Sequence, residues 1–385
     1  MSDGPLRVVS VAHSAIKRAG GRQRYLPLLG DRDLDMHLVV PKQWREFGRV
    51  LDAEGETDPR MNLHILPIVI PDAGPMNWYL HFYPGLRRLL KQTRPDVLHL
   101  WEEPWSLVAL QAALLKSNAA LVLEVDQNIL RTLPPPFEWI RRFVLGRTAH
   151  VLARSADAQM VVRARGYKGP VSFIGYGVDR DRFHPGPVAE KGAGAPLKIG
   201  YVGRVVIEKG LDDALDALAR TEAAHTLSIL GEGPHRPALQ ARAEQSGLSS
   251  RLSFASWGSP DEVASFLRGV DVLILLTRTM PRVKEQFGRV IIEAQSCGVP
   301  VIGSTCGAIP DVVGEGGWII PESDPASLAQ LLDEIGKDPA LLKAKREAAI
   351  KNAARFSYEA VASVLKAAWV EAAGEAIHRE SRARA

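Results

Sequence analysis

Residues 197–218 read LKIGYVGRVVIEKGLDDALDAL, which is the pattern of a buried strand, a turn and a helix. The apolar run ends in Gly203-Arg204, and Lys209-Gly210 precede the helical segment. Glycines let the backbone approach a ligand, and an Arg–Lys pair can clamp a diphosphate at a helix N-terminus. Taken alone, the stretch is more simply explained as a structural turn.

The same alternation of short apolar strands and longer helical segments continues along the whole chain. The strands expected in the first half are 6–12, 36–40, 97–100, 120–125 and 150–153. Those expected in the second half are 197–202, 225–230, 252–255, 272–276 and 299–303. Several are apolar nearly throughout, which is typical of parallel strands covered on both faces. The sequence therefore predicts an α/β protein with two doubly wound sheets, one in each half.

A chain of 385 residues is too long for one ordinary core and suits two domains. Glycine, proline and charged residues gather between the two halves, as in an interdomain linker. We expect a Rossmann-like acceptor-side domain over 1–180, a linker over 181–196, a Rossmann-like donor domain over 197–355, a helix crossing back to the first domain over 356–377, and a frayed tail over 378–385. Two such domains imply a cleft, and ligands of open parallel sheets bind beyond the carboxyl ends of the strands.

The composition excludes several classes of protein. The two cysteines, Cys297 and Cys306, are too few for a disulfide framework or a zinc cluster and indicate a reducing compartment. The N-terminus lacks a basic segment followed by an apolar one, and no apolar run is long enough to span a bilayer. These features predict a cytoplasmic protein.

The net charge of +4 is unevenly distributed. Residues 1–185 carry 25 lysines and arginines against 19 aspartates and glutamates, whereas the remainder is slightly acidic. A basic half suggests an anionic partner such as phosphates, lipid headgroups or nucleic acid, although an ordinary solvated surface explains it equally well.

A second motif, EQFGRVIIE, runs from Glu285 to Glu293. Eight residues span just over two helical turns, so we expect Glu285 at or before a helix N-terminus and Glu293 about two turns inside. A buried carboxylate at Glu293 needs a partner, and ligand hydroxyls would serve. The amides of Gly288 to Val290 could bind a phosphate. A capped amphipathic helix with Glu293 in a salt bridge explains the spacing equally well.

Neither the dinucleotide fingerprint G-x-G-x-x-G nor a P-loop follows any expected strand. Together, the two motifs instead resemble those of retaining family-four glycosyltransferases of the GT-B fold. The resemblance extends over most of the C-terminal half, through 177–179 (GVD), 231–234 (GEGP), 298–301 (GVPV), 309–313 (IPDVV) and 355–358 (RFSY).

This resemblance implies roles for individual residues. Arg204 and Lys209 would hold the donor diphosphate and stabilise the leaving group, and Glu293 would accept from the ribose hydroxyls. Glu285 would lie beside the donor sugar, either as a nucleophile or as a bystander to a front-face return mechanism in which the positive charges do most of the catalysis. The donor-binding residues implied are Gly20, Gly21, Gly203, Arg204, Lys209, Glu285, Phe287, Gly288, Arg289, Val290 and Glu293. The family generally needs no metal, so we expect no cofactor beyond the nucleotide-sugar co-substrate.

The N-terminal half resembles the family less. Gly20-Gly21 match the glycine-rich loop that approaches the donor phosphates, with Arg22 and Arg24 nearby. A flexible surface turn is the alternative, since glycine pairs are common in turns.

Many family members carry a His at the strand end where this chain has Asp126 and Asn128. We expect Asp126 to take the catalytic position near the donor sugar and Asn128 to contact the acceptor. Glu102-Glu103 could orient the acceptor or act as a base, with Glu103 as the acceptor residue, or the pair could cap a helix starting near Pro104.

Residues 78–91 and 137–147 mix aromatic and basic side chains at helical spacing. Such helices can lie in a membrane interface, where acidic lipids attract the charge. Aromatic residues in the core and basic residues on a solvated face explain the pattern equally well. Peripheral association with the inner face of a membrane is therefore one of two open interpretations.

The expected activity is transfer of a hexose from a nucleotide-sugar to a hydroxyl acceptor, which could be lipid-linked, in cell-surface polysaccharide or glycolipid biosynthesis. Two alternatives share the fold. A nucleotide-sugar 2-epimerase would change the sugar without an acceptor, and an inactive scaffold would only bind a nucleic acid or a membrane surface. The paired basic and acidic donor residues argue against both, and we expect no nucleic-acid partner.

Overall fold

The computed structural model describes residues 4–46, 49–69, 77–187 and 192–384. Its contacts divide the chain into one unit of residues 1–176 with 358–385 and a second unit of 177–357. The chain thus passes into the second unit after Tyr176, a few residues before the linker predicted at 181–196.

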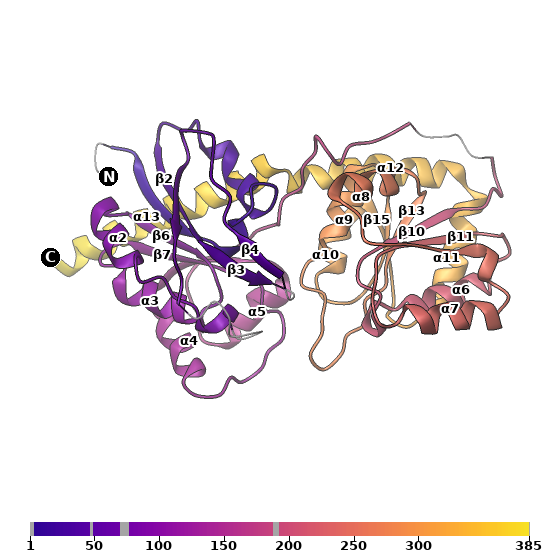
Figure 1. The fold of residues 1–385 in the computed structure, drawn as a ribbon, viewed down its shortest axis with the longest axis horizontal. Helices are drawn as coiled ribbons and strands as arrows, with labels where there is room; N and C mark the ends of the chain where they lie inside the picture. The colour runs from indigo at the N-terminus through magenta and orange to yellow at the C-terminus, as the bar shows by residue number, and fades with distance from the viewer. Residues whose placement is uncertain (1–3, 47–48, 70–76, 188–191, 385) are drawn as a thin grey trace. The chain divides into compact units, whose positions relative to one another are not determined.

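A parallel sheet of seven strands forms the N-terminal unit, in the order β5-β2-β1-β6-β7-β8-β9 (Figure 1). These strands are β1 (Leu6–Val11), β2 (Leu34–Pro41), β5 (Asn62–Leu66), β6 (Val97–Trp101), β7 (Ala120–Val125), β8 (Thr148–Ala153) and β9 (Val171–Phe173). A separate antiparallel hairpin of β3 (Gln43–Glu46) and β4 (Arg49–Asp52) follows β2. The central strands β6, β7 and β8 are mostly Val, Leu and Ala and are buried along their whole length, because both faces of the sheet are covered.

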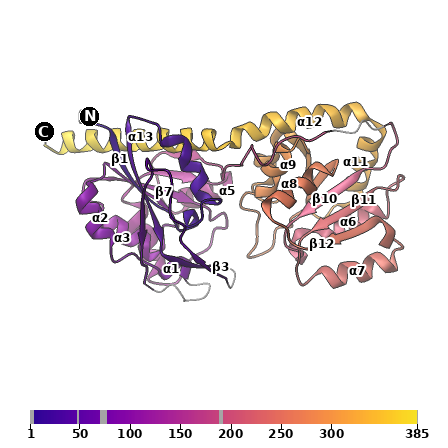
Figure 2. The same cartoon turned by 45° about the horizontal axis from the view of Figure 1, so that its top comes forward.

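The two faces of this sheet have separate hydrophobic cores. One face is covered by α2 (Leu86–Thr93), α3 (Leu107–Leu115), α4 (Phe137–Leu145) and α5 (Ala156–Ala164), with the short α1 (Asn77–Leu80) beside α3. On the other face, Leu365 and Trp369 of α13 (Tyr358–Arg384) pack into the core. Figure 2 shows α13 and α3 on opposite sides of the sheet. Helix α13 continues to Arg384, through the tail that we expected to be frayed.

The C-terminal unit contains a parallel sheet of six strands in the order β12-β11-β10-β13-β14-β15. The strands are β10 (Lys198–Val202), β11 (Thr226–Leu230), β12 (Leu252–Ala255), β13 (Val272–Leu275), β14 (Val301–Ser304) and β15 (Gly317–Ile320). The helices are α6 (Leu211–Leu218), α7 (Arg236–Gln245), α8 (Pro260–Arg268), α9 (Arg289–Ser296), α10 (Ile309–Val313), α11 (Pro325–Lys337) and α12 (Pro339–Ala353). The predicted fold class, two Rossmann-like units with parallel sheets, is confirmed.

Among the helices of the described residues, none combines the length and the apolar character that crossing a bilayer would require.

Candidate active site

Three side chains meet at the carboxyl ends of β10 and β13, which are neighbours in the sheet of the C-terminal unit. Lys209 Nζ lies 2.6 Å from Glu285 Oε2 and donates to Thr277 Oγ1 at 3.3 Å. The Thr277 hydroxyl donates to the same Glu285 oxygen at 2.9 Å. The sequence predicted that Lys209 and Glu285 belong to one site. It missed Thr277, whose signal is a polar residue directly after a buried strand.

Gly210 explains why Lys209 reaches β13. Its φ of +66° is left-handed, and a Cβ there would lie 2.2 Å from the carbonyl oxygen of Leu276. Only glycine lets the turn before α6 approach the end of β13 this closely. The turn therefore places Lys209 beside Thr277.

A close approach of two backbone segments also shapes the end of β10. A Cβ on Gly231, at the end of β11, would lie 1.9 Å from the carbonyl oxygen of Gly203. Tyr201 is buried and donates from its hydroxyl to the Arg204 carbonyl at 2.7 Å, which holds the turn in place. Burial raises the pKa of Tyr201 well above its ordinary value, so the phenol remains a donor. The Arg204 side chain is exposed at this strand end.

The backbone of Glu285 is held by the segment after β14. Its carbonyl accepts from the Ala308 amide at 3.1 Å, and a Cβ on Gly307 would lie 2.2 Å from that carbonyl oxygen. Three residues later, Gly288 adopts a left-handed φ of +77° and precedes the first residue of α9. The backbone of Glu285 is thus fixed four residues before α9 begins, and the free amides at the start of such a helix favour anions.

Glu293 lies one turn inside α9, because the helix begins only at Arg289 and not at Glu285. The expectation of two turns is corrected, since residues 285–288 form a loop. Burial raises the pKa of Glu293, and the charge of Arg289 one turn earlier opposes the shift. A half-buried carboxyl with a raised pKa is suited to hydrogen-bond ligand hydroxyls.

Phe287 is buried, and its ring packs edge-on against Phe356 with centroids 5.5 Å apart. Its side chain therefore belongs to the core of the C-terminal unit and does not line the donor site as the sequence suggested.

The arginines beside Gly20-Gly21 are also structural. Arg22 is buried and donates to the carbonyls of Ala15, Ile16 and Glu54. Arg24 is buried against Glu124, and its two terminal guanidinium nitrogens donate to the carboxylate at 2.7 and 2.9 Å. Both guanidiniums are therefore occupied inside the N-terminal unit, so the two arginines near Gly20-Gly21 serve its structure.

Gly21 is required by packing. A Cβ at Gly21 would lie 2.8 Å from both the Ser14 carbonyl oxygen and the Trp101 ring, whereas Gly20 has room. Gly21 is therefore packed tightly against Ser14 and Trp101 and does not belong to a flexible surface turn.

Asp126 follows β7 and is engaged by two neighbours. Its Oδ1 accepts from Arg154 Nε at 2.8 Å and from the Tyr176 hydroxyl at 2.9 Å. The loop that contains Asp126 and the buried Asn128 is anchored by Glu103, whose Oε1 accepts the amides of Asp126 and Gln127 at 2.8 Å each.

Glu103 does not cap a helix. Ser106 caps α3, with its hydroxyl accepting from the Ala109 amide. Burial and the charge of Asp126 raise the pKa of Glu103 to about 8, although the two backbone hydrogen bonds act in the opposite direction. The N-terminal candidates Glu103, Asp126 and Asn128 thus lie in one loop system.

Comparison with known proteins identifies the family. Residues 189–356 match the model for glycosyl transferases group 1, and residues 26–182 match that for glycosyltransferase family 4. A D-inositol 3-phosphate glycosyltransferase of Corynebacterium jeikeium is 28% identical over 69% of this chain and 66% of its own length. A GDP-mannose-dependent phosphatidylinositol monomannoside mannosyltransferase of Mycobacterium tuberculosis is 27% identical over 80% of this chain and 82% of its own.

The structure of HepE from Anabaena in complex with UDP shares the fold, with a TM-score of 0.69, 17% identity and coverage of 94% of this chain and 98% of that one. The chain spans about half to two thirds of the length of the first curated relatives that it matches. Since the two family models together cover most of both units, the chain belongs to glycosyltransferase family 4, the glycosyl transferases group 1.

Proposed function

We propose that this chain is a retaining glycosyltransferase that moves a hexose from a nucleotide-sugar to a hydroxyl acceptor in cell-surface polysaccharide or glycolipid biosynthesis. One observation carries the proposal: the Lys209 ammonium lies 2.6 Å from the Glu285 carboxylate, just before the N-terminus of α9. A cation and a helix N-terminus together suit the diphosphate of a nucleotide-sugar. The named activities of relatives on inositol phosphate and phosphatidylinositol mannoside support an acceptor of that general kind.

In the proposed reaction, the bond between the sugar and the diphosphate breaks, and the acceptor oxygen bonds to the sugar carbon in its place. Negative charge develops on the leaving phosphate, which takes up the proton of the acceptor hydroxyl. Lys209 and the exposed Arg204 stabilise this charge, so the donor site works without a metal ion. Glu293 binds the ribose hydroxyls, and the Glu285 carboxylate lies beside the sugar as it gains positive character.

Glu285→Gln tests this arrangement through binding. The substitution removes a negative charge from the side of Lys209 and releases the ammonium from its 2.6 Å ion pair. We expect a nucleoside diphosphate to bind roughly tenfold more tightly, since about 1.4 kcal/mol of repulsion is removed, while sugar transfer falls. Isothermal titration measures the first effect and a transfer assay the second. Weaker binding by this variant would contradict the placement of the diphosphate at Lys209.

A thermal-shift screen against nucleoside diphosphates and their sugars identifies the donor, because a ligand that binds the folded state raises its melting temperature. The donor found by the screen then separates the alternatives. A transferase needs an added acceptor for turnover, a 2-epimerase converts the sugar nucleotide alone, and a scaffold binds without turnover.

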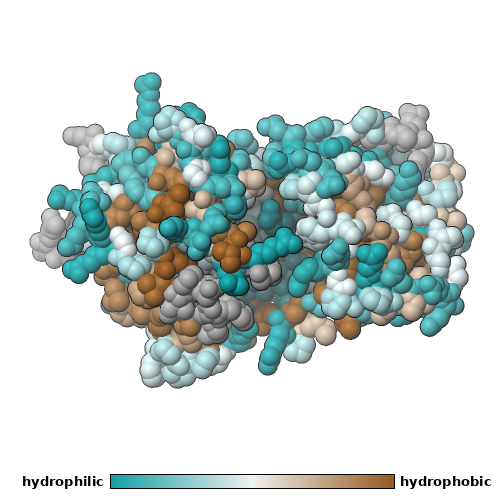
Figure 3. Space-filling view, in the orientation of Figure 1, coloured by the Kyte–Doolittle hydropathy of each residue, from teal (hydrophilic) through white to brown (hydrophobic). Residues whose placement is uncertain are grey.

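We also propose that the N-terminal unit docks on an anionic membrane through α4. Trp139 is 66% exposed, Arg142 is exposed, and the Arg147 guanidinium lies 3.5 Å from the centroid of the Phe143 ring. Figure 3 shows further apolar residues at the surface of this unit in the region of α3, where Leu114 is exposed. An aromatic side chain beside cationic ones favours an interface of acidic lipids.

The other aromatic and basic segment, 78–91, contributes less to this surface than its sequence indicated. His81 and Tyr83 are buried, which leaves Trp78 partly exposed and Arg87, Arg88 and Lys91 on the exposed side of α2. Tyr83, for example, belongs to a hydrophobic core of the N-terminal unit.

Vesicle co-sedimentation tests the docking proposal. We expect binding to rise with the anionic lipid fraction, and the double variant Arg142→Ala/Arg147→Ala to bind roughly thirtyfold more weakly, at about 1 kcal/mol for each arginine. Trp139→Ala should also weaken binding. Trp257→Ala in the C-terminal unit, where the side chain is 59% exposed, is the matched control and should bind normally. Binding that is independent of lipid charge would refute the proposal.

A further inference from the structure

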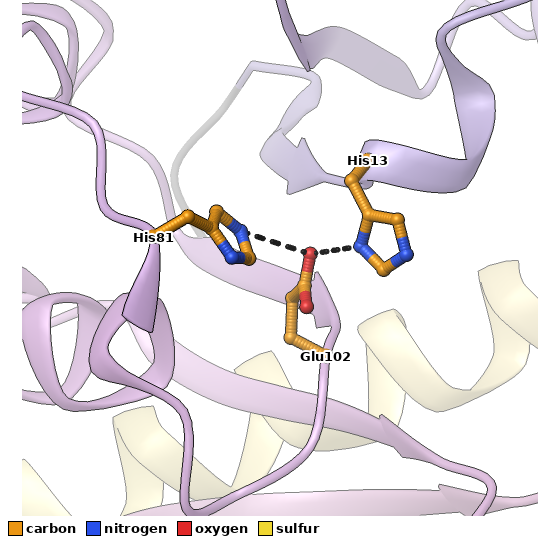
Figure 4. A group of neighbouring side chains, drawn as sticks. All are labelled: His13, His81 and Glu102. Carbon is orange, nitrogen blue, oxygen red and sulfur yellow. Dashed lines mark hydrogen bonds and ion pairs between the residues drawn. The ribbon is translucent and has the colours of Figure 1, made fainter. Parts of the chain in front are cut away.

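Three side chains from separate parts of the N-terminal unit converge beneath its surface. His13 follows β1, His81 follows α1, and Glu102 follows β6. Figure 4 shows the carboxylate of Glu102 between the two imidazole rings. One ligand atom from each residue lies within 4.8 Å of the other two, and the residues are only 7%, 0% and 4% exposed.

Both histidines contact the carboxylate of Glu102, but only the contact of His13 is within hydrogen-bond distance. His13 Nδ1 lies 2.5 Å from Glu102 Oε1, which is a short hydrogen bond. His81 Nε2 lies 3.6 Å from the same oxygen, which is too long for one. Two ligands of a tetrahedral zinc ion, each bonded at about 2.1 Å, are separated by roughly 3.4 Å. The second histidine is therefore spaced from the carboxylate as a fellow metal ligand would be.

Two further buried polar groups surround this cluster. The Trp44 ring stacks on His13 at 4.4 Å, and the Tyr83 ring lies 5.8 Å from His81. Within the described part of the chain, neither Trp44 Nε1 nor the Tyr83 hydroxyl has a hydrogen-bond partner, and both side chains are almost fully buried. Buried polar groups without partners in a native fold point to a missing water or ion.

The donor set itself is one that metal ions accept: two imidazoles and a carboxylate, brought together from three segments and buried. Imidazole ligates metals in its neutral form, and a carboxylate beside two neutral imidazoles gives the site a single negative charge.

We propose that His13, His81 and Glu102 bind one divalent transition-metal ion, of which zinc is the best match to two imidazoles and a carboxylate. A water completes the tetrahedron, and its hydrogen bonds serve the buried groups of Trp44 and Tyr83. Binding requires the atoms of His13 and Glu102 to separate from 2.5 Å to about 3.4 Å. The ion would hold together three segments: the one after β1, the end of α1 and the end of β6. The segment after β1 leads to Gly20-Gly21.

Metal titration of the untagged chain tests the proposal. After removal of bound metal with a chelator, addition of Zn²⁺ and dialysis of the excess, we expect one Zn²⁺ per chain by mass spectrometry of the metal content. Co²⁺ should give the visible absorption of a four-coordinate site. Zn²⁺ should also raise the melting temperature, since a ligand of the folded state stabilises it.

Two variants and a control locate the ion. His81→Ala and Glu102→Gln should each lower Zn²⁺ affinity by more than about a hundredfold, because loss of an outer hydrogen-bond partner alone costs 10–100-fold. His64→Ala is the matched control: His64 Nε2 pairs with His37 Nδ1 at 2.9 Å elsewhere in the same unit, and its loss should leave one ion bound. Substoichiometric binding by the wild-type chain overturns the proposal whether or not the variants fold. Equal affinity in His81→Ala and the wild type also overturns it.

Discussion

Lys209→Ala is expected to lower kcat/KM for sugar transfer by roughly 10²- to 10³-fold, the usual effect of removing one group that stabilises developing negative charge. The ammonium is positioned by Glu285 at 2.6 Å and Thr277 at 3.3 Å, and the turn 203–210 contains no second lysine. Binding of the nucleoside diphosphate should weaken as well, by roughly tenfold for the loss of a charged hydrogen bond. A coupled assay of diphosphate release and isothermal titration measure the two effects.

Lys198→Ala is the matched control for this prediction. Lys198 lies at the start of β10, at the opposite end of the strand from the site, and its side chain is exposed. The control should retain wild-type kcat/KM. Glu293→Ala should resemble Lys209→Ala, because it removes the proposed ribose contact. If both Lys209→Ala and Glu293→Ala transferred sugar at the wild-type rate, the donor site would have to lie elsewhere.

Glu124→Gln is expected to destabilise the N-terminal unit by about 3–5 kcal/mol, the usual cost of removing one partner from a buried ion pair. Glu124 is fully buried and binds Arg24 and Arg154, which are themselves buried. The neutral amide that replaces the carboxylate would leave two guanidiniums in the core with too little negative charge. The melting temperature should fall by roughly 10 °C, as seen by calorimetry.

An exposed ion pair of the same unit provides the comparison. Glu54 contacts Lys17 at 3.0 Å, with both side chains about two fifths exposed. Glu54→Gln should therefore change stability by less than about 1 kcal/mol. Equal effects of the two substitutions would show that the buried carboxylate contributes no more than a surface one.

The same buried carboxylate has a predictable pH dependence. Burial alone would raise the pKa of Glu124, but the charges of Arg154 and Arg24 outweigh it and hold the pKa well below its ordinary value. A group with a lowered pKa in the folded state stabilises the fold fully above its unfolded pKa, near 4.3. This stabilisation is lost as the pH falls from there toward the folded pKa, and the Glu124→Gln variant should lack that part of the acid sensitivity.

Much of the C-terminal unit was predictable because its signals are local. The glycines at 203, 210 and 288 each coincide with a left-handed or crowded backbone position, so the sequence marks the turns directly. The family assignment from these motifs is confirmed by the comparisons. The position of Glu293 was misjudged because the expected helix was counted from Glu285, although Gly288 marks the turn after which α9 begins at Arg289.

The N-terminal unit was harder to predict because its decisive contacts are distant in sequence. Arg24 pairs with Glu124, which lies 100 residues away, and nothing near Arg24 distinguishes a buried arginine from a phosphate-binding one. The strand Asn62–Leu66 escaped prediction because its polar residues suit an edge position that only the completed sheet defines. Likewise, His13, His81 and Glu102 meet only after three segments have folded together.

Because α13 belongs to the N-terminal unit, that unit cannot be completed until the end of the chain has been synthesised. The unit consists of residues 1–176 and 358–385, and Leu365 and Trp369 fill the core on one face of its sheet. A ribosome that adds 5–20 residues per second takes roughly 10–40 s to make the intervening residues 177–357. During that interval the nascent sheet lacks the part of its cover that Leu365 and Trp369 supply, so the part of the chain made first completes its core only when the part made last has emerged.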